Sequence, residues 1–553
     1  MSSKSAIQDA LALNAQGRRD EALGLLEALN RDHPADLEVR YCLGAVAAEA
    51  GRNELARQHI GAVLAARGDH FGAASILSNV HRAGGDAAAC VALWRQFVAA
   101  APDDPRGRIL LIEALLIAGD PSAADALAGS LPPGPGEAEL RLAVAQTYHA
   151  AGFEQRAIEH YRRCLALRPG FAPARQSLAA ALQSVGDLDA AEPLYRGLLA
   201  ENPANVEVLG NLGTLYKDRG DLGEALSWYG RAMALRRKRL EPGEIATAGA
   251  DPAARTTTLH SLRLEREQLE YLGEQGIGPA DGAELIAGYD AVIAGLESAG
   301  VGGQRIVLPE QHYARIGAVM QRLVHLEETP ALAGGALNPE LDYPAIEARF
   351  EQAAPGIVVV DDFLRPEALA ALRRYCHRST IWFGYGKVRG YCGAYMQDGF
   401  GNALLLQLAR ELQDKLPTVV GPHYLNQMWG YIYDQRMAGI TAHADPAAVN
   451  LNFWIVPDEA SLAPDIGGLV VSKREAPAEW DFAEYNNRPE VLDRYMDDSE
   501  QVRVPYRCNR MVMFNSNLVH KTDEFEFRPG FTNRRINITM LFGQRRGPQT
   551  PAT

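Results

Sequence analysis

The sequence predicts a multidomain protein with an all-helical repeat array, a helical connector and a C-terminal domain of short β-strands. Three observations lead to this fold class. Glycines recur at a nearly constant period up to residue 239, a segment rich in Pro, Gly and Ala then breaks the period, and β-branched and aromatic runs dominate from residue 356. The chain of 553 residues has room for several domains, because one domain takes about 100–200 residues.

Composition and charge exclude several functional classes. Hydrophobic residues make up 47% and charged residues 22%, which is typical of globular proteins. The formal net charge of −14, without a cluster of Lys and Arg, argues against binding to nucleic acid or to an anionic membrane. We find no secretory signal and no membrane-spanning apolar run. Six cysteines lie far apart without a CxxC pair, so we expect a cytoplasmic protein.

The glycine period is the clearest pattern of residues 1–239. The spacings are 34, 34, 34, 33, 34 and 34 residues, and a small residue follows each glycine by five positions. The glycines are Gly17, Gly51, Gly85, Gly119, Gly152, Gly186 and Gly220, and the small residues are Ala22, Ala56, Cys90, Ala124, Ala157, Ala191 and Ala225. A turn glycine followed by a small residue lets two antiparallel helices pack closely, so each period predicts a helical hairpin.

The period resembles that of the tetratricopeptide (TPR) repeat. The last unit carries the consensus spacing in Leu209, Leu212, Gly213, Tyr216, Gly220, Ala225, Tyr229 and Ala232. The resemblance covers about seven units and implies a solenoid with a concave surface that binds a protein or peptide. An array that only dimerises the protein or shields the next domain stays open as an alternative, and the oligomeric state is not predicted.

Residues 240–355 are interpreted as a linker and helical connector. The stretch 240–255 is rich in Pro, Gly and Ala and predicts a connection. Helices are expected over 259–276, over 283–300 and around 313–326, followed by a loop over 331–356. The pattern does not decide whether these helices cap the array or belong to the next domain.

Residues 356–547 predict the β-rich domain, and 548–553 a tail. Strand-like runs are GIVVVDDFL, MWGYIYDQ, VNLNFWIV, GGLVVS, RMVMFN and RINITMLFG, with one amphipathic helix in RPEALAALRRYCHR. Many short strands with few helices favour a sandwich, a jelly roll or a barrel.

The candidate metal ligands lie in this β region. His443 and Asp445 are two positions apart, so on an extended strand their side chains point to the same side. His520 follows a hydrophobic strand 77 residues after His443 and supplies a third ligand. Two histidines and one carboxylate form the facial triad of non-haem Fe(II) oxygenases, although zinc accepts the same ligands.

A polar strand face follows the second histidine. Alternation in the strand after residue 534 separates Arg535, Asn537 and Thr539 from the apolar residues between them. A guanidinium pairs bidentately with a carboxylate. Arg535 therefore suits the distal carboxylate of a dicarboxylic co-substrate, although a surface cation on an edge strand is the alternative.

These elements together resemble the Fe(II)/2-oxoglutarate-dependent dioxygenases, in particular the prolyl-4-hydroxylase-like superfamily, over residues 355–545. The resemblance is carried by the HxD motif at His443, Gly467-Gly468-Leu469, the strand ending in Phe514 before His520, and the R-x-x-I-T pattern that begins at Arg535.

The resemblance implies a double-stranded β-helix in which His443, Asp445 and His520 bind Fe(II) and Arg535 binds 2-oxoglutarate, with O₂ as the second co-substrate. It also implies that Tyr431 or Tyr433 contacts the co-substrate, although an aromatic core patch explains either tyrosine equally well. The further co-substrate candidates are Asn452, Asn537 and Thr539. Halogenating relatives lack the carboxylate ligand, so the presence of Asp445 favours hydroxylation.

One spacing departs from the family pattern. Arg535 lies fifteen residues after His520, farther than is usual, so we expect an enlarged loop. Arg528 and Arg534 stay open as alternative anchors, although Arg534 would share the apolar face of the strand.

Three functions follow from these patterns. The first is hydroxylation of a protein or peptide that the repeats recruit. The second is oxidation of a small molecule or a carrier-bound metabolite, with the repeats docking a partner. The third is a scaffold whose β domain binds without catalysis.

Overall fold

The computed structural model describes residues 3–131, 134, 136–237, 255–352, 355–384, 390–437, 440–477, 479–486 and 488–545. The chain divides into two compact units, residues 1–201 and 202–553. The expected connection at 240–255 lies outside the described residues except for Arg255, and the expected tail lies wholly outside them. None of the helices described combines the length and the apolar composition that crossing a bilayer requires.

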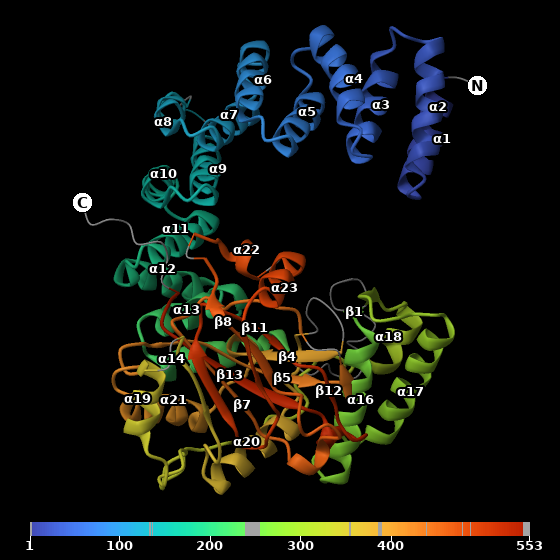
Figure 1. Cartoon of the computed structure of the whole chain (residues 1–553). Helices are drawn as coiled ribbons and strands as arrows, with labels where there is room; N and C mark the ends of the chain where they lie inside the picture. Colours follow the sequence, from blue (N-terminus) through green and yellow to red (C-terminus); the bar gives the residue numbers. More distant parts are fainter. Residues whose placement is uncertain are drawn as a thin grey trace. The chain divides into compact units, whose positions relative to one another are not determined.

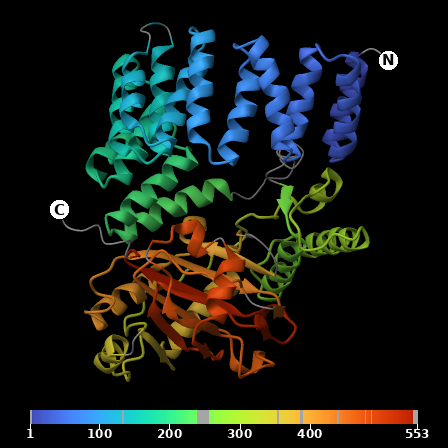
Figure 2. The ribbon, with the colours of Figure 1, turned by 45° about the horizontal axis from the view of Figure 1, so that its top comes forward.

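The first unit is a row of antiparallel helical hairpins (Figures 1 and 2). Its helices are α1 (Ser3–Ala15), α2 (Arg19–Asp32), α3 (Leu37–Glu49), α4 (Asn53–Ala66), α5 (Phe71–Ala83), α6 (Ala87–Ala100), α7 (Pro105–Ile117), α8 (Pro121–Gly129), α9 (Glu137–Ala150), α10 (Glu154–Leu167), α11 (Ala172–Ser184) and α12 (Leu188–Glu201). The periodic glycines all have φ between +72° and +87°, a region that favours glycine. The small residues five positions later are at most 6% exposed. The predicted hairpins are therefore confirmed.

A seventh hairpin, α13 (Val206–Asp218) and α14 (Leu222–Arg236), keeps the repeat pattern but belongs to the second compact unit. Leu226 of α14 abuts the backbone of Gly401, where an added Cβ would lie 2.5 Å from its side chain. Arg236 Nη1 lies 3.2 Å from Asp398 Oδ1. The boundary between compact units thus falls one hairpin before the predicted end of the array at residue 239.

The connector helices are α16 (Leu259–Glu274), α17 (Gly282–Ser298) and α18 (Glu310–Ile316), beside the paired strands β1 (Thr256–Thr257) and β2 (Ile306–Val307). They share an apolar core of their own. Gln268 Nε2 donates to the carbonyls of His377 at 3.0 Å and Ser379 at 2.9 Å, which lie at the end of α20 (Pro366–Arg378). The connector helices therefore belong to the second unit and pack against α20. The sequence had left open whether they cap the repeat array or belong to the next domain.

Two local expectations in the connector need correction. The helix around residues 313–326 ends at Ile316, and the segment expected as a loop contains helix α19 (Tyr343–Gln352). Asp342 Oδ1 accepts the backbone N–H of Ala345 at 3.0 Å, and the Tyr343 and Ile346 side chains are buried. The cap at Asp342 and the buried side chains stabilise this helix, although the residues that flank it are rich in Pro, Gly and Ala.

The remaining chain forms three sheets (Figure 1). The largest has the order β3-β10-β7-β13-β5-β4, a second has the order β11-β8-β9, and β12 pairs with β6, all antiparallel. The strands are β3 (Ile357–Val360), β4 (Tyr391–Tyr395), β5 (Leu425–Tyr433), β6 (Arg436–Met437), β7 (Val449–Trp454), β8 (Leu469–Glu475), β9 (Gln501–Val504), β10 (Met511–Asn515), β11 (Leu518–Thr522), β12 (Phe525–Glu526) and β13 (Ile536–Phe542). The other helices are α21 (Ala403–Lys415), α22 (Phe482–Asn486), α23 (Pro489–Asp497) and the short η2 (Met396–Asp398), η3 (Asp458–Ala460) and η4 (Phe531–Asn533).

The predicted strands are confirmed as β3, β5, β7, β8, β10 and β13, and the predicted amphipathic helix is α20. Every residue of β7 and β13 is buried, including the polar Asn450, Asn452, Asn537 and Thr539. Asn452 of β7 lies opposite Thr539 of β13, and Trp454 lies opposite Asn537. This register gathers polar side chains inside the second unit.

Candidate metal centre

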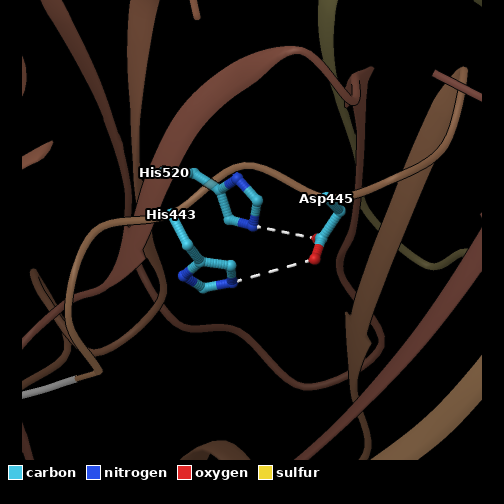
Figure 3. Close-up of side chains that lie close together, drawn as sticks. All are labelled: His443, Asp445 and His520. Carbon is cyan, nitrogen blue, oxygen red and sulfur yellow. Dashed lines mark ion pairs between the residues drawn. The ribbon is translucent and has the colours of Figure 1, made fainter. Parts of the chain in front are cut away.

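The loop before β7 and strand β11 bring His443, Asp445 and His520 together (Figure 3). The backbone N–H of His443 donates to the carbonyl of His520 at 2.9 Å, and the reverse bond is 2.8 Å. This bridge fixes the two histidines opposite each other, with ring centroids 4.5 Å apart. One ligand atom from each of the three side chains lies within 4.8 Å of the other two. The three predicted ligands therefore converge.

The hydrogen bonds of the imidazoles orient their lone pairs toward the carboxylate. Nδ1 of His443 lies 2.9 Å from the carbonyl of Thr441, and Nδ1 of His520 lies 3.0 Å from the carbonyl of Leu518. A carbonyl only accepts, so each Nδ1 carries the proton and each Nε2 has a free lone pair. Nε2 of His520 lies 3.3 Å from Asp445 Oδ2 and that of His443 lies 4.0 Å from Oδ1. The donor set fits one metal ion.

Burial and neighbouring groups set the protonation of this cluster. Burial acts to raise the pKa of Asp445, but the two imidazoles, whenever they are protonated, and the hydrogen bond from the Asn450 amide lower it below its usual value. Burial, together with the charge of His520, lowers the pKa of His443. At neutral pH this favours an ionised carboxylate and a neutral His443, the forms that bind a metal.

A chain of buried hydrogen bonds leads away from Asp445. Asn450 Nδ2 donates to Asp445 Oδ2 at 2.6 Å, and Asn452 Nδ2 donates to Asn450 Oδ1 at 2.6 Å. Asn452 Oδ1 in turn accepts from Asn537 at 2.9 Å and from Thr539 at 2.7 Å. The sequence pointed to Asn452, Asn537 and Thr539 but missed Asn450, which alone among these four touches the carboxylate. Its position two residues before Asn452 on β7 was the available signal.

Arg535 is a buried cation with an unpaired donor. Its side chain is 0% exposed, Nε donates to the carbonyl of Gly467 at 2.8 Å, and Nη2 donates to that of Gly468 at 3.3 Å. Nη1 has no hydrogen-bond partner in the part of the chain that the structure describes. Burial lowers the Arg535 pKa, but an arginine stays charged in proteins. A buried guanidinium with a free N–H suits an anionic ligand.

The two alternative anchors have other partners. Arg534 pairs with Glu267 of α16 at 2.6 Å and with Asp434 at 2.9 Å. The side chain of Arg528 is exposed and donates from Nε to the carbonyl of Glu459 at 2.6 Å. Arg534 therefore ties α16 to the strand, and of the three arginines Arg535 alone is both buried and incompletely paired.

The two candidate tyrosines differ in their surroundings. The ring centroid of Tyr433 lies 4.7 Å from Arg535 Cζ. Tyr431 packs among aromatic rings of β4 and β5, and its hydroxyl lies 3.4 Å from that of Tyr395. Tyr433 thus contacts the candidate anchor, whereas Tyr431 belongs to the aromatic patch that the sequence offered as the alternative.

Residues 182–241 match the family model of the tetratricopeptide repeat. The helical array is built of TPR repeats. Among solved structures, the chain is similar to MamA from Desulfovibrio magneticus RS-1, at 19% identity over 37% of this chain and 96% of that chain, with a TM-score of 0.24. It is similar to a thermophilic TPR protein of Thermus thermophilus, at 21% identity over 33% and 100% of the two chains, with a TM-score of 0.24.

A third similar structure is the C-terminal part of a TPR repeat-containing protein from Cytophaga hutchinsonii, at 15% identity over 44% and 99% of the two chains, with a TM-score of 0.32. No curated protein matches the chain. TPR arrays expose extended binding surfaces, so the repeats are a protein-interaction scaffold.

Proposed function

We propose that the β-rich part of the second unit is a double-stranded β-helix oxygenase domain that binds Fe(II) and 2-oxoglutarate and hydroxylates a protein or peptide recruited by the TPR repeats. The observation that carries this proposal is the meeting of His443, Asp445 and His520 ligand atoms within 4.8 Å. Two imidazoles and one carboxylate leave coordination positions open for a co-substrate and O₂.

Arg535 favours an iron oxygenase over a zinc site with the same ligands. Its unpaired Nη1 is buried beside the rings of Tyr433, Phe525 and Trp454, whose centroids lie 4.7, 5.2 and 5.6 Å from Cζ. In such apolar surroundings a guanidinium binds a carboxylate more strongly than it does in water. The distal carboxylate of 2-oxoglutarate is the ligand that the resemblance implies for this position.

The strand arrangement supports the same fold. A six-stranded and a three-stranded antiparallel sheet account for most of the strands, and the bridge between His443 and His520 extends the smaller sheet at β11. The candidate ligands lie on the side of the smaller sheet, whereas the Asn450 chain lies on β7 and β13 of the larger one. A jelly roll formed from these two sheets explains why one polar network spans both.

Within this proposal each side chain has a defined task. Nε2 of His443, Nε2 of His520 and one oxygen of Asp445 hold the metal, Asn450 fixes the second oxygen of Asp445, and Arg535 orients the co-substrate. Bound Fe(II) would supply O₂ activation coupled to decarboxylation of 2-oxoglutarate to succinate and CO₂. The carboxylate ligand favours hydroxylation, as the resemblance implies.

The substrate class follows from the repeats. Seven hairpins in TPR spacing form the scaffold, which supports a macromolecular substrate over a free metabolite. All six cysteines are unpaired, which supports a reducing cytoplasmic location as part of the proposal.

The first experiment tests the oxygenase itself. Anaerobic addition of Fe(II) and 2-oxoglutarate is expected to produce a weak visible charge-transfer band, and admission of O₂ is expected to release succinate slowly. Both signals should be lost in His443→Ala and kept in Arg528→Ala, an exposed arginine of the same region. Absence of both signals from the wild type would leave only the TPR scaffold.

The second experiment tests the recruiting role. Removing residues 1–201 deletes one compact unit and keeps the seventh hairpin, which packs on the β-rich part through Leu226. We expect succinate release without substrate to persist, while hydroxylation of proteins in a cell extract, detected as incorporated isotopic oxygen, is lost. Full hydroxylation by the shortened protein would contradict recruitment by the repeats and favour a small-molecule substrate.

A further inference from the structure

A short insertion between β8 and β9 packs against the loop that carries two of the candidate ligands. Residues 476–500 include α22 and α23. Their apolar side chains share one buried cluster with that loop and with β8 and β11. The members are Ala442, Ala444, Val470, Ala476, Tyr485, Leu492, Met496 and Val519, with Trp480 and Tyr495 packed at the edge. The insertion and the ligand loop therefore form one core.

The end of α22 also holds the backbone between the two ligands. Ala444 lies between His443 and Asp445, and its N–H donates to the carbonyl of Tyr485 at 2.8 Å. Its carbonyl accepts from Asn486 Nδ2 at 3.1 Å. Both hydrogen-bonding groups of Ala444 are therefore fixed by adjacent residues of the insertion.

The three consecutive residues of the ligand loop are held by β11, by α22 and by the turn between β10 and β11. His443 pairs with His520 of β11, Ala444 pairs with α22, and the N–H of Asp445 donates to the carbonyl of Ser516 at 3.3 Å. Rotation about the Ala444 backbone changes the angle between the two flanking side chains. The bonds from α22 hold the two peptide planes on either side of Ala444 and so add to the constraint that the bonds of His443 and Asp445 place on this rotation.

The insertion is itself anchored on the far side of Tyr485. Arg545 Cζ lies 3.9 Å from the centroid of the Tyr485 ring. Arg545 Nη2 donates to the carbonyl of Pro477 at 2.9 Å, and Arg545 Nε donates to Asn517 Oδ1 at 3.0 Å. These contacts tie the start of the insertion to the residue just before β11.

We infer that Asn486 is a positioning residue for the metal site, and that the packing of α22 and α23 and the binding of the metal stabilise each other. This inference rests on the proposed metal-binding function. A site whose ligand angle depends on α22 binds the ion more tightly when α22 is packed, and by linkage the ion favours the packed insertion. Outer contacts of this kind change metal affinity by about 10–100-fold.

The test uses the full chain with Mn(II) as a redox-stable probe. Binding is measured by calorimetry and by the electron paramagnetic resonance line shape of the bound ion. Asn486→Ala is expected to weaken Mn(II) binding by about 10–100-fold and to alter the line shape. Tyr495→Phe is the matched control, because its hydroxyl donates to the carbonyl of Glu475 at the end of β8 and not to the backbone of the ligand loop. It should leave both readouts unchanged.

A second measurement needs no substitution. Hydrogen exchange of residues 479–500 in the wild type is expected to slow when Mn(II) is added. If Asn486→Ala binds Mn(II) as the wild type does, or if exchange does not respond, the positioning role is wrong while the metal site stands. If the wild type binds no Mn(II), the proposed metal site fails and the positioning role with it.

Discussion

Replacing Asn450 with leucine tests whether this buried amide orients a metal ligand or only stabilises the fold. Asn450 is 0% exposed, donates to Asp445 Oδ2 at 2.6 Å and accepts from Asn452 at 2.6 Å. Leucine has a similar size but can form neither bond. Asp445 then loses the amide that orients its carboxylate, and Asn452 loses the acceptor for its amide group.

The size of the effect follows from these two bonds. A hydrogen bond to a charged group contributes about 1.5–3 kcal/mol, and a buried donor without an acceptor costs about 1–3 kcal/mol. Because neighbouring effects do not add fully, we expect the free energy of unfolding to fall by about 3 kcal/mol. Mn(II) affinity should fall by about 10–100-fold, since the carboxylate is no longer held in one orientation.

The assay compares Asn450→Leu with Asn452→Leu by urea unfolding and Mn(II) calorimetry. Asn452 lies one bond farther from Asp445 and is equally embedded in the network. We expect a similar loss of stability in the two variants and a clearly larger loss of metal affinity for Asn450→Leu. Equal affinity losses, or wild-type affinity in Asn450→Leu, would refute the view that this amide orients the ligand.

Three further predictions concern other parts of the second unit. Arg535→Met should raise the 2-oxoglutarate concentration needed for half-maximal succinate release by more than about tenfold, and an unchanged requirement would exclude this anchor. Burial raises the pKa of Glu265 on α16 from 4.5 to about 7. The unfolded chain therefore loses this proton at lower pH than the folded protein does. The stability that the group contributes is fully present below pH 4.5 and is lost as the pH rises through about 7. Urea unfolding should therefore show a loss of about 3 kcal/mol over this range that Glu265→Gln lacks; equal slopes in both proteins would contradict this. Gly213→Ala places a Cβ 2.5 Å from a tyrosine ring of α14 and should lower the free energy of unfolding by about 1–3 kcal/mol. Gly210→Ala in the same helix is the control. Its Cβ would meet no atom within 4 Å, so this variant should be as stable as the wild type or slightly more stable.

Much of the fold could be predicted because its signals are periodic or local. The glycine period predicts turns with positive φ, and the hairpins follow from it. The buried strands β7 and β13 stand out as short segments rich in β-branched and aromatic residues, in which polar and apolar side chains partly alternate. The boundary at residue 201 could not be predicted, because the seventh repeat keeps the same pattern and differs in its contacts with the rest of the second unit, at Gly401 and Asp398.

The candidate site could be predicted only in part from the sequence. The two-residue spacing of His443 and Asp445 is a local signal, and the bridge to His520 confirms that they converge. The contacts of Asn450 and Asn486 depend on how separate elements meet in space, and the only sequence signal for Asn450 was its spacing of two residues from Asn452 on β7. The ion pair of Arg534 with Glu267 could not be predicted for the same reason, because the partners lie 267 positions apart in the sequence.

The most direct test of the central claim is a crystal structure of the full chain grown with Mn(II), with the anomalous signal used to locate the ion. We predict one strong peak about 2.0–2.3 Å from Nε2 of His443, Nε2 of His520 and an oxygen of Asp445. The peak should be absent in crystals of Asp445→Ala. A peak at other residues, or none at these three, would contradict the proposed metal centre.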